Sequence, residues 1–455
     1  LNFGASLDTL KTNGNLTLKS TVASTATVAE MLTGNFINGD VTVERYIHTG
    51  TTGGAHTKTW QFLSTPTTGQ TIRQAWQENG TTPAGFGTII TGTGTGFDIT
   101  TALPSIKFFN DVAVNWTAVT NTNNALLNKL GYMLFVRGDR TVNTSGATPN
   151  NTVLRSKGTL FQPSNPPPSV AVTANKFQTF GNPYASRIEF SKVRAISTGI
   201  NDVFYVWDPT LAGSAGYGGY QTISGVAGYV PTVGTPPTGN PASVLYPAGV
   251  AAPFIESGQA IFVRCRPNPG GFVMFTELNK VTGNRLVTRP AGTTDLPANR
   301  GFITASLFTG QGRIADGNIV AFENGLSNDV NENDADKLIN PGENFGIMRA
   351  DKLLAVEARE SVRSADTIFY HLQNLKKQPY QFRFAPVNMR REGLLAYLID
   401  RFNNSSTDIS LTDSSFISFT ITEDVRSQAA DRFILVFKKA KKDKFEKGSG
   451  RTEKD

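Results

Sequence analysis

Two stretches of the chain, Gly131-Tyr-Met-Leu-Phe-Val-Arg137 and Gly258-Gln-Ala-Ile-Phe-Val-Arg264, share the pattern Gly-x-x-aliphatic-Phe-Val-Arg. A second pair of matching strings lies upstream of them, Trp60-Gln-Phe-Leu-Ser-Thr-Pro66 and Phe177-Gln-Thr-Phe-Gly-Asn-Pro183. The prolines are 117 residues apart and the leading glycines 127, a nearly constant offset with a small insertion. Self-similarity at a fixed spacing is typical of a repeated structural unit. We therefore predict two related modules in which these strings form equivalent strands.

Alternation of apolar and polar residues predicts strands over most of the chain. Residues 14–47 alternate with a period of two, which indicates half-buried strands. Seven further alternating runs lie between residues 303 and 437, the number typical of a β-sandwich. Short helices are expected only at 187–196 and 334–340. The predicted fold class is all-β: tandem β-sandwich or jelly-roll-like domains, with two related central modules and a C-terminal β-sandwich.

The length of 455 residues exceeds what one ordinary core supports. Residues 162–169, with the sequence QPSNPPPS, favour an extended, stiff break between modules. The predicted division is an N-terminal β segment at 1–50, a first module at 51–165, a second at 166–298, a C-terminal sandwich at 299–440 and a basic tail or linker at 441–455.

The charge distribution argues against a nucleic-acid partner. The net charge is +7, but residues 438–455 hold eight Lys/Arg against four Asp/Glu, so +4 of it lies in the tail. A nucleic-acid footprint would need a basic face on the folded part. No run reaches the ~18 apolar residues of a membrane helix, so no membrane span is expected. Cys265 is the single cysteine, so disulfides are not the framework.

The tripeptide Arg137-Gly-Asp139 looks like a receptor-binding motif, but it directly follows a predicted strand. The second copy has Arg264-Cys-Arg266 at the same place, which favours a strand-ending turn in which Gly138 supplies a permissive backbone. We expect Cys265 to serve packing. The acidic residues are scattered singly and no Gly-x-Ser-x-Gly elbow lies between a strand and a helix. The chain is therefore predicted to be no enzyme, with no catalytic residues.

Aromatic residues give the best binding candidates. The insert at 211–253 carries tyrosines that suit stacking on a ligand, and we predict ligand binding by Tyr217, Tyr220 and Tyr229. Tryptophans would extend such a platform, but Trp60 and Trp207 lie in alternating strands and are expected in the core.

The most acidic stretch, 328–336, is the candidate metal site. Its predicted calcium-binding residues are Asp329, Asn331, Asn333, Asp334 and Asp336. The stretch is not a helix-loop-helix calcium motif, because Asp334 stands where that motif needs Gly and Asn340 where it needs Glu. A looser calcium site competes with a solvated turn in which Asp334 or Asp336 caps the short helix. No other cofactor is expected.

Several strings together resemble one family. They are Val41-Thr-Val-Glu-Arg-Tyr-Ile47, Trp60-Gln-Phe-Leu-Ser-Thr-Pro66, Ala75-Trp-Gln-Glu78, Gly131-Tyr-Met-Leu-Phe-Val-Arg-Gly-Asp-Arg140, Gly181-Asn-Pro-Tyr184, Phe204-Tyr-Val-Trp-Asp-Pro209, Ser257-Gly-Gln-Ala260 and Arg432-Phe-Ile-Leu-Val-Phe437. Together they resemble the large non-catalytic β-modules of secreted and cell-surface Bacteroidetes proteins, and the resemblance covers nearly the whole chain, from about Gly14 to Phe437. Such proteins are typically exported by the type IX secretion system and carry a C-terminal sorting domain.

The resemblance implies an extracellular or cell-surface location and the type IX machinery as a partner. Further β-domains and a sorting signal usually follow such modules, whereas this chain ends in a basic tail, so we expect a piece of a longer protein. Asp8-Thr-Leu10 resembles the O-glycosylation sites of these bacteria, which makes Thr9 the candidate acceptor.

The predicted function is that of a non-enzymatic extracellular structural or adhesive segment of a type IX-secreted bacterial surface protein. One alternative is a set of glycan-binding accessory modules of a secreted carbohydrate-active protein, with surface glycans as partners. Another is a subunit of a self-assembling surface filament, associating through an edge strand or the N-terminal β segment.

Overall fold

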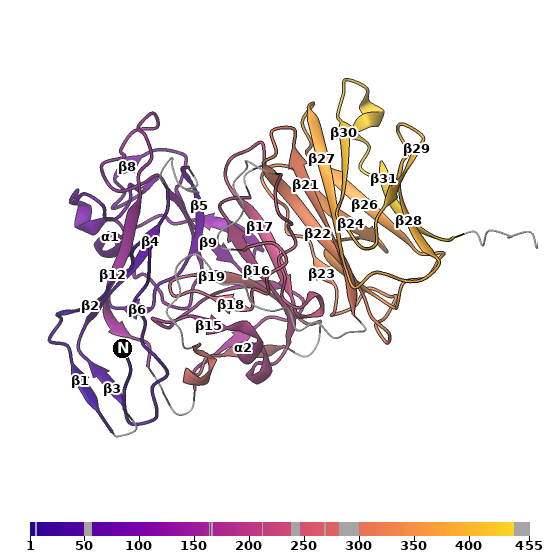
Figure 1. Ribbon diagram of the computed structural model, residues 1–455. Coiled ribbons are helices and arrows are strands. Elements are labelled where there is room, and N and C mark those ends of the chain that lie inside the picture. The colour runs from indigo at the N-terminus through magenta and orange to yellow at the C-terminus, as the bar shows by residue number, and fades with distance from the viewer. Residues whose placement is uncertain are drawn as a thin grey trace, which may run out of the picture.

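The computed structural model describes residues 1–4, 7–49, 57–162, 164, 167–211, 213–237, 246–267, 270–281 and 300–440. The described part is nearly all β, which confirms the predicted fold class. Figure 1 shows the sheets in a row, from the indigo N-terminal region through the magenta centre to the orange and yellow C-terminal unit. The predicted tail at 441–455 lies outside the described residues.

The two repeated strings form equivalent strands of two four-stranded sheets. The first sheet has the order β10-β9-β11-β5 and the second β17-β16-β19-β14. In chain order, each sheet consists of a first strand, a hairpin of two strands, and a last strand that lies between the first strand and the hairpin. The strands are β5 (Thr59–Leu63), β9 (Ile106–Asn110), β10 (Asn115–Ala118) and β11 (Tyr132–Val136), then β14 (Phe177–Gly181), β16 (Ile200–Asp208), β17 (Gly219–Ser224) and β19 (Ala260–Cys265).

The pairing register of the two copies differs by two residues. Trp60 pairs with Phe135 in the first sheet, whereas its counterpart Phe177 pairs with Arg264 in the second. A shift of two keeps every side chain on its own face, because the side-chain period of a strand is two. Phe135 and its counterpart Phe262 therefore both point to the junction between the sheets.

The N-terminal strands share a sheet with the first module. Seven consecutive residues of β4, from Val41 to Ile47, pair antiparallel with β12 from Gly158 to Thr152. This sheet has the order β2-β4-β12-β6, and β1 pairs separately with β3. The bounds are β1 (Thr9–Lys11), β2 (Leu16–Leu18), β3 (Phe36–Asn38), β4 (Val41–Ile47), β6 (Thr67–Thr68) and β12 (Thr152–Leu160).

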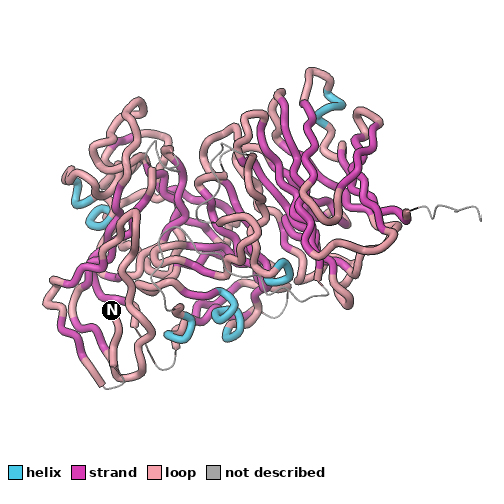
Figure 2. The backbone as a smooth tube through the Cα atoms, viewed as in Figure 1, coloured by secondary structure: helices cyan, strands magenta, loops and turns pink. Residues whose placement is uncertain are grey.

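Short strand pairs and helices complete the central region. The pairs are β7 (Thr91–Gly92) with β8 (Ile99–Thr100), β13 (Ser169–Val172) with β20 (Gly271–Met274), and β15 (Ile188–Glu189) with β18 (Phe254–Ile255). The α-helices are α1 (Ile72–Ala75) and α2 (Phe190–Ile196), with 3-10 turns at Glu78–Gly80, Gly225–Ala227, Glu277–Asn279 and Val425–Gln428. Helix α2 confirms the helix expected at 187–196. Figure 2 shows these helices as small pieces at the edge of the sheets. Within the described residues, neither α-helix has the length and apolar character needed to cross a membrane.

The C-terminal unit is one bent, eleven-stranded sheet around its own core. Its order is β29-β28-β31-β26-β24-β25-β22-β21-β27-β30, with β23 added on β25. Phe345 on β24 contacts Phe382 on β27 at a ring distance of 4.8 Å, so distant parts of the sheet face each other across the core. The strands are β21 (Gly301–Thr309), β22 (Ile314–Phe322), β23 (Ala335–Asp336), β24 (Asn344–Arg349), β25 (Lys352–Arg359), β26 (Thr367–Gln373), β27 (Pro379–Val387), β28 (Leu394–Asp400), β29 (Ser405–Ile409), β30 (Ser415–Thr420) and β31 (Phe433–Lys439).

One apolar cluster joins the three units. It combines Phe62 of the first sheet, Phe262 of the second and Ile319 of the C-terminal sheet, with their neighbours. Every residue of β21 and β22 is buried, because one face packs on the C-terminal core and the other on this junction. The modules are therefore held by a shared core as well as by the chain between them.

Phe262 lies at the centre of this junction, so we predict that Phe262→Ala costs about 3–5 kcal/mol of unfolding free energy, the range for a truncated core phenylalanine. Its ring is 2% exposed and contacts Phe109 at 4.8 Å and Trp116 at 5.5 Å. Urea unfolding followed by tryptophan fluorescence checks this. Phe369→Ala is the control, because Phe369 is 47% exposed and should cost less than about 1 kcal/mol. Equal costs at the two positions would contradict the shared core.

Candidate functional site

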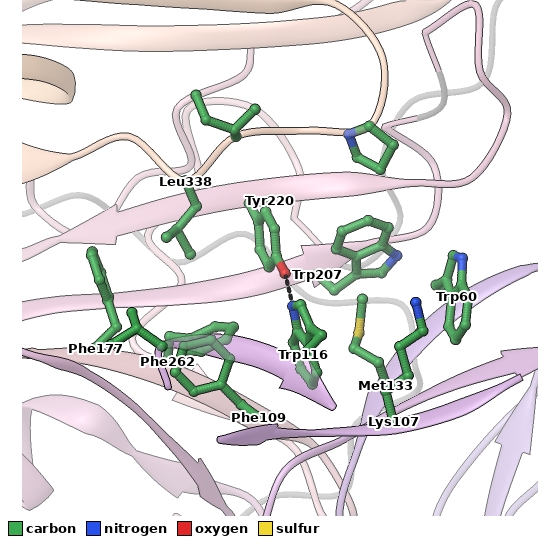
Figure 3. A pocket seen from close by; sticks show the side chains of 13 residues that line it. Trp60, Lys107, Phe109, Trp116, Met133, Phe177, Trp207, Tyr220, Phe262 and Leu338 are labelled. Atoms are coloured by element: carbon green, nitrogen blue, oxygen red, sulfur yellow. Dashed lines mark hydrogen bonds between the residues drawn. The ribbon is translucent and has the colours of Figure 1, made fainter. Parts of the chain in front are cut away.

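A cleft of about 360 Å³ lies where the three units meet. It is lined by Trp60, Lys107, Phe109, Val114, Trp116, Met133, Phe177, Trp207, Tyr220, Phe262, Leu338, Ile339 and Pro341 (Figure 3). Phe262, Trp207 and Tyr220 are buried at its base, whereas Val114 and Ile339 are exposed at its rim. The volume falls in the usual range for small-molecule sites, and aromatic walls are common in them.

The first sheet supplies one wall. Its side chains are Trp60 on β5, Met133 on β11, Lys107 on β9 and Trp116 on β10. The strand pairings place these side chains on one face of the sheet. The Lys107 Nζ lies 5.2 Å from the centre of the Trp60 ring, close enough for a cation–π contact.

The second sheet supplies the opposite wall. Trp207 on β16 and Tyr220 on β17 face each other directly across the strand pair, with ring centres 4.9 Å apart and nearly perpendicular planes. The Trp116 Nε1 donates a hydrogen bond of 3.1 Å to the Tyr220 hydroxyl and so ties the two walls together (Figure 3). Burial raises the pKa of Tyr220, which keeps this hydroxyl protonated.

The third wall is the segment after β23, which carries Leu338, Ile339 and Pro341. The helix predicted at 334–340 is wrong: Ala335–Asp336 form β23, which pairs with β25. Lys337 is buried and pairs with the buried Asp316 at 2.7 Å, and this anchors the segment to β22. The Tyr220 backbone amide donates to Asn340 Oδ1 at 2.7 Å, which fixes the segment against the second sheet.

The polar groups of the cleft are few. Among the described residues that line it, Lys107 is the one charged residue, and none is a carboxylate, amide, Ser or Thr side chain. The Trp207 Nε1 is buried without a hydrogen-bond partner. This nitrogen lies against Gly218. A β-carbon added at residue 218 would come within 2.4 Å of the Trp207 Nε1, so only glycine fits beside this indole.

The three predicted tyrosines do not form one platform. Tyr220 is in the cleft. Tyr217 is 48% exposed and packs beside Phe135 with a ring distance of 6.3 Å, outside the cleft lining. Tyr229 is half-buried and its hydroxyl donates to Asp202 at 2.7 Å, next to the core of the second module. Trp60 was expected in the core, but it is only half-buried and lines the cleft.

The predicted calcium residues point to different partners. Both carboxylate oxygens of Asp334 accept backbone amides, from Asn331 and Ala358. Asp336 pairs with Arg264 at 2.9 Å. Asn331 Oδ1 accepts the Asn333 amide at 2.9 Å, and the Asp329 amide donates to Ser327. Among the residues that the structure describes, no group of three or more His, Cys, Asp or Glu could hold a metal ion. Calcium binding therefore stays a prediction from the sequence alone.

The structure also shows the surroundings of two further predicted positions, Thr9 and Cys265. Thr9 is exposed on β1, so its hydroxyl is accessible to a modifying enzyme, while modification itself stays a prediction. Cys265 is 1% exposed within the core of the second module, and burial raises its pKa to about 11, so it packs as expected.

No protein-family model, curated protein or solved structure matches the chain.

The Arg137-Gly-Asp139 tripeptide forms a turn directly after β11, as predicted, with Gly138 and Asp139 buried and Arg137 half-buried. Asp139 is 3% exposed, and its carboxylate accepts hydrogen bonds from Gly85, at 2.6 Å, and from Thr141. Gly138 has a φ of +133°, a backbone conformation that favours glycine. Burial alone would raise the pKa of Asp139, but these hydrogen bonds outweigh it and lower the pKa.

We predict that Asp139→Ala lowers the unfolding free energy by about 1–3 kcal/mol at neutral pH, because it leaves buried donors unpaired. The pKa is lower in the folded than in the unfolded state, so the stabilisation by the carboxylate is present above the unfolded value and is lost as the pH falls through the folded value. The wild-type and variant unfolding curves, measured from pH 7 down to pH 3, should therefore converge in acid. A constant difference over this range would exclude an ionised Asp139 as the cause.

Proposed function

We propose that the protein is a non-enzymatic, adhesive surface module that holds a sugar ring of a glycan in the aromatic cleft. The observation that carries this proposal is the set of three indoles, Trp60, Trp116 and Trp207, gathered around one cleft with an exposed rim. Aromatic faces bind the C–H face of a sugar ring through dispersion and burial of apolar surface. A module that served only as a spacer would not require an open cleft lined by aromatic residues.

The walls of the cleft support a binding role. Trp116 contacts Phe62, Phe109 and Phe262 with ring distances of 5.5–5.6 Å, so its orientation is set by packing before any ligand arrives. Preorganised side chains lose little conformational freedom on binding, which favours affinity. An extracellular location and export by the type IX system belong to the same proposal, on the strength of the sequence resemblance.

We predict that Trp60→Ala weakens glycan binding at least about ten-fold, a loss of ~1.4 kcal/mol. Trp60 is half-buried on the edge strand β5, so its removal takes away the stacking surface and should leave the fold intact. A glycan array with the purified chain identifies the ligand, and titration calorimetry compares the variants.

Tyr217→Ala is the matched control. It removes an exposed aromatic ring that lies outside the cleft lining, so it should leave the affinity unchanged. The proposal fails if no glycan on the array binds, or if the Tyr217 variant loses as much affinity as the Trp60 variant.

A further inference from the structure

The polar groups around the cleft are donors. The Lys107 ammonium and the Trp60 indole nitrogen can only donate. The one N–H of Trp116 is already bonded to Tyr220, and the buried Trp207 Nε1 lies against Gly218. The Tyr220 hydroxyl already accepts from Trp116, so the proton that it carries is what it offers to a ligand. A neutral sugar presents hydroxyl groups that also need acceptors, and the described side chains of the cleft supply none beyond this oxygen.

Lys107 gives the cleft its charge. Among the described residues it forms no ion pair, and its Nζ lies over the Trp60 ring, the half-exposed stacking surface. A ring stacked beside Trp60 would therefore carry its substituents past this ammonium. An acidic substituent there gains a charge-assisted hydrogen bond, which is stronger than a neutral one.

The charges next to the cleft do not cancel Lys107. Arg264 lies over Phe177 at 5.1 Å, and its charge is balanced by Asp336 through an ion pair of 2.9 Å. Asp111, on the turn that also carries Val114, is absent from the cleft lining, and its Oδ1 is buried. The net charge of the lining residues that the structure describes is thus +1, from Lys107.

We infer that the ligand is acidic: a hexuronic acid residue of a polysaccharide, stacked between the indoles with its carboxylate on Lys107. This inference rests on the proposed glycan binding and specifies its substrate class. The shared chemistry is a flat-faced ring bearing one carboxylate, which a free aromatic acid also has. An extracellular polysaccharide is the source that suits the open rim, because a polymer can continue past Val114 and Ile339 into solvent.

The test is titration of the full chain with tetra-galacturonate, with its fully methyl-esterified form and with phenylacetate. Quenching of tryptophan fluorescence reports binding, since three of the four tryptophans line the cleft. We expect the acid to bind at least about ten-fold more tightly than the ester at low salt, and the difference to shrink as salt screens the charge.

Lys107→Gln should abolish the preference for the acid over the ester. Lys129→Gln is the matched control, because Lys129 lies over the Phe161 ring at 5.0 Å in the same kind of contact but outside the cleft, and it should keep the full preference.

The outcomes separate the two proposals. Equal binding of acid and ester, or an unchanged preference in the Lys107 variant, overturns the acidic class and leaves glycan binding standing. Phenylacetate binding more tightly than either oligosaccharide, with the same dependence on Lys107, overturns the polysaccharide as the source. Binding of uncharged glycans alone on the array overturns the acidic ligand, and binding of no glycan overturns the proposed function itself.

Discussion

The packing of Phe262 against aromatic rings from both modules is the contact on which the rest of the structure depends. Its ring meets Phe62 and Phe109 of the first sheet and Tyr220 of its own sheet at centre distances of 4.8–6.0 Å. These are the perpendicular and tilted arrangements that the aromatic quadrupole prefers. Since the same cluster continues to Ile319 of the C-terminal sheet, one core fixes the relative position of all three units.

The repeat explains how such a core arises. Each copy places a phenylalanine at the same point of its last strand, and the two-residue difference in register leaves both on the junction side. The two phenylalanines nevertheless have different surroundings. Phe262 is buried at the centre, whereas Phe135 packs at the periphery between Trp60 and Tyr217. The arginines that end the two strings keep a common role, each lying about 5 Å from a phenylalanine ring of its own sheet.

The sequence was sufficient for the fold class and the equivalent strands, because period-two alternation and a fixed repeat spacing are local signals. It could not supply the cleft. Alternation indicates on which face of their strands Trp60 and Trp207 lie, but it does not indicate which distant segment packs against that face. The hydrogen bond from Trp116 to Tyr220 joins residues 104 positions apart. Lys107 belongs to no recognisable sequence motif, and only the structure shows that it lies among the apolar residues of the cleft.

The error at 334–340 has the same origin. Asp334 looked like the cap of a short helix, but tertiary contacts override that local preference. Its carboxylate instead receives the amide of Ala358, and Lys337 turns inward to Asp316. The chain is thereby held as a short strand and an extended segment, and this is what brings Leu338 to the cleft.

The wall formed by Leu338, Ile339 and Pro341 belongs to a different unit from the other two walls. Under the proposed function, a ligand that contacts this third wall would couple occupancy of the cleft to docking of the C-terminal unit, and such coupling acts equally in both directions. Any free energy that the third wall adds to ligand affinity would equally oppose separation of the C-terminal unit from the other two units. In an adhesive protein under load, the attached molecule would itself reinforce the joint that transmits the force.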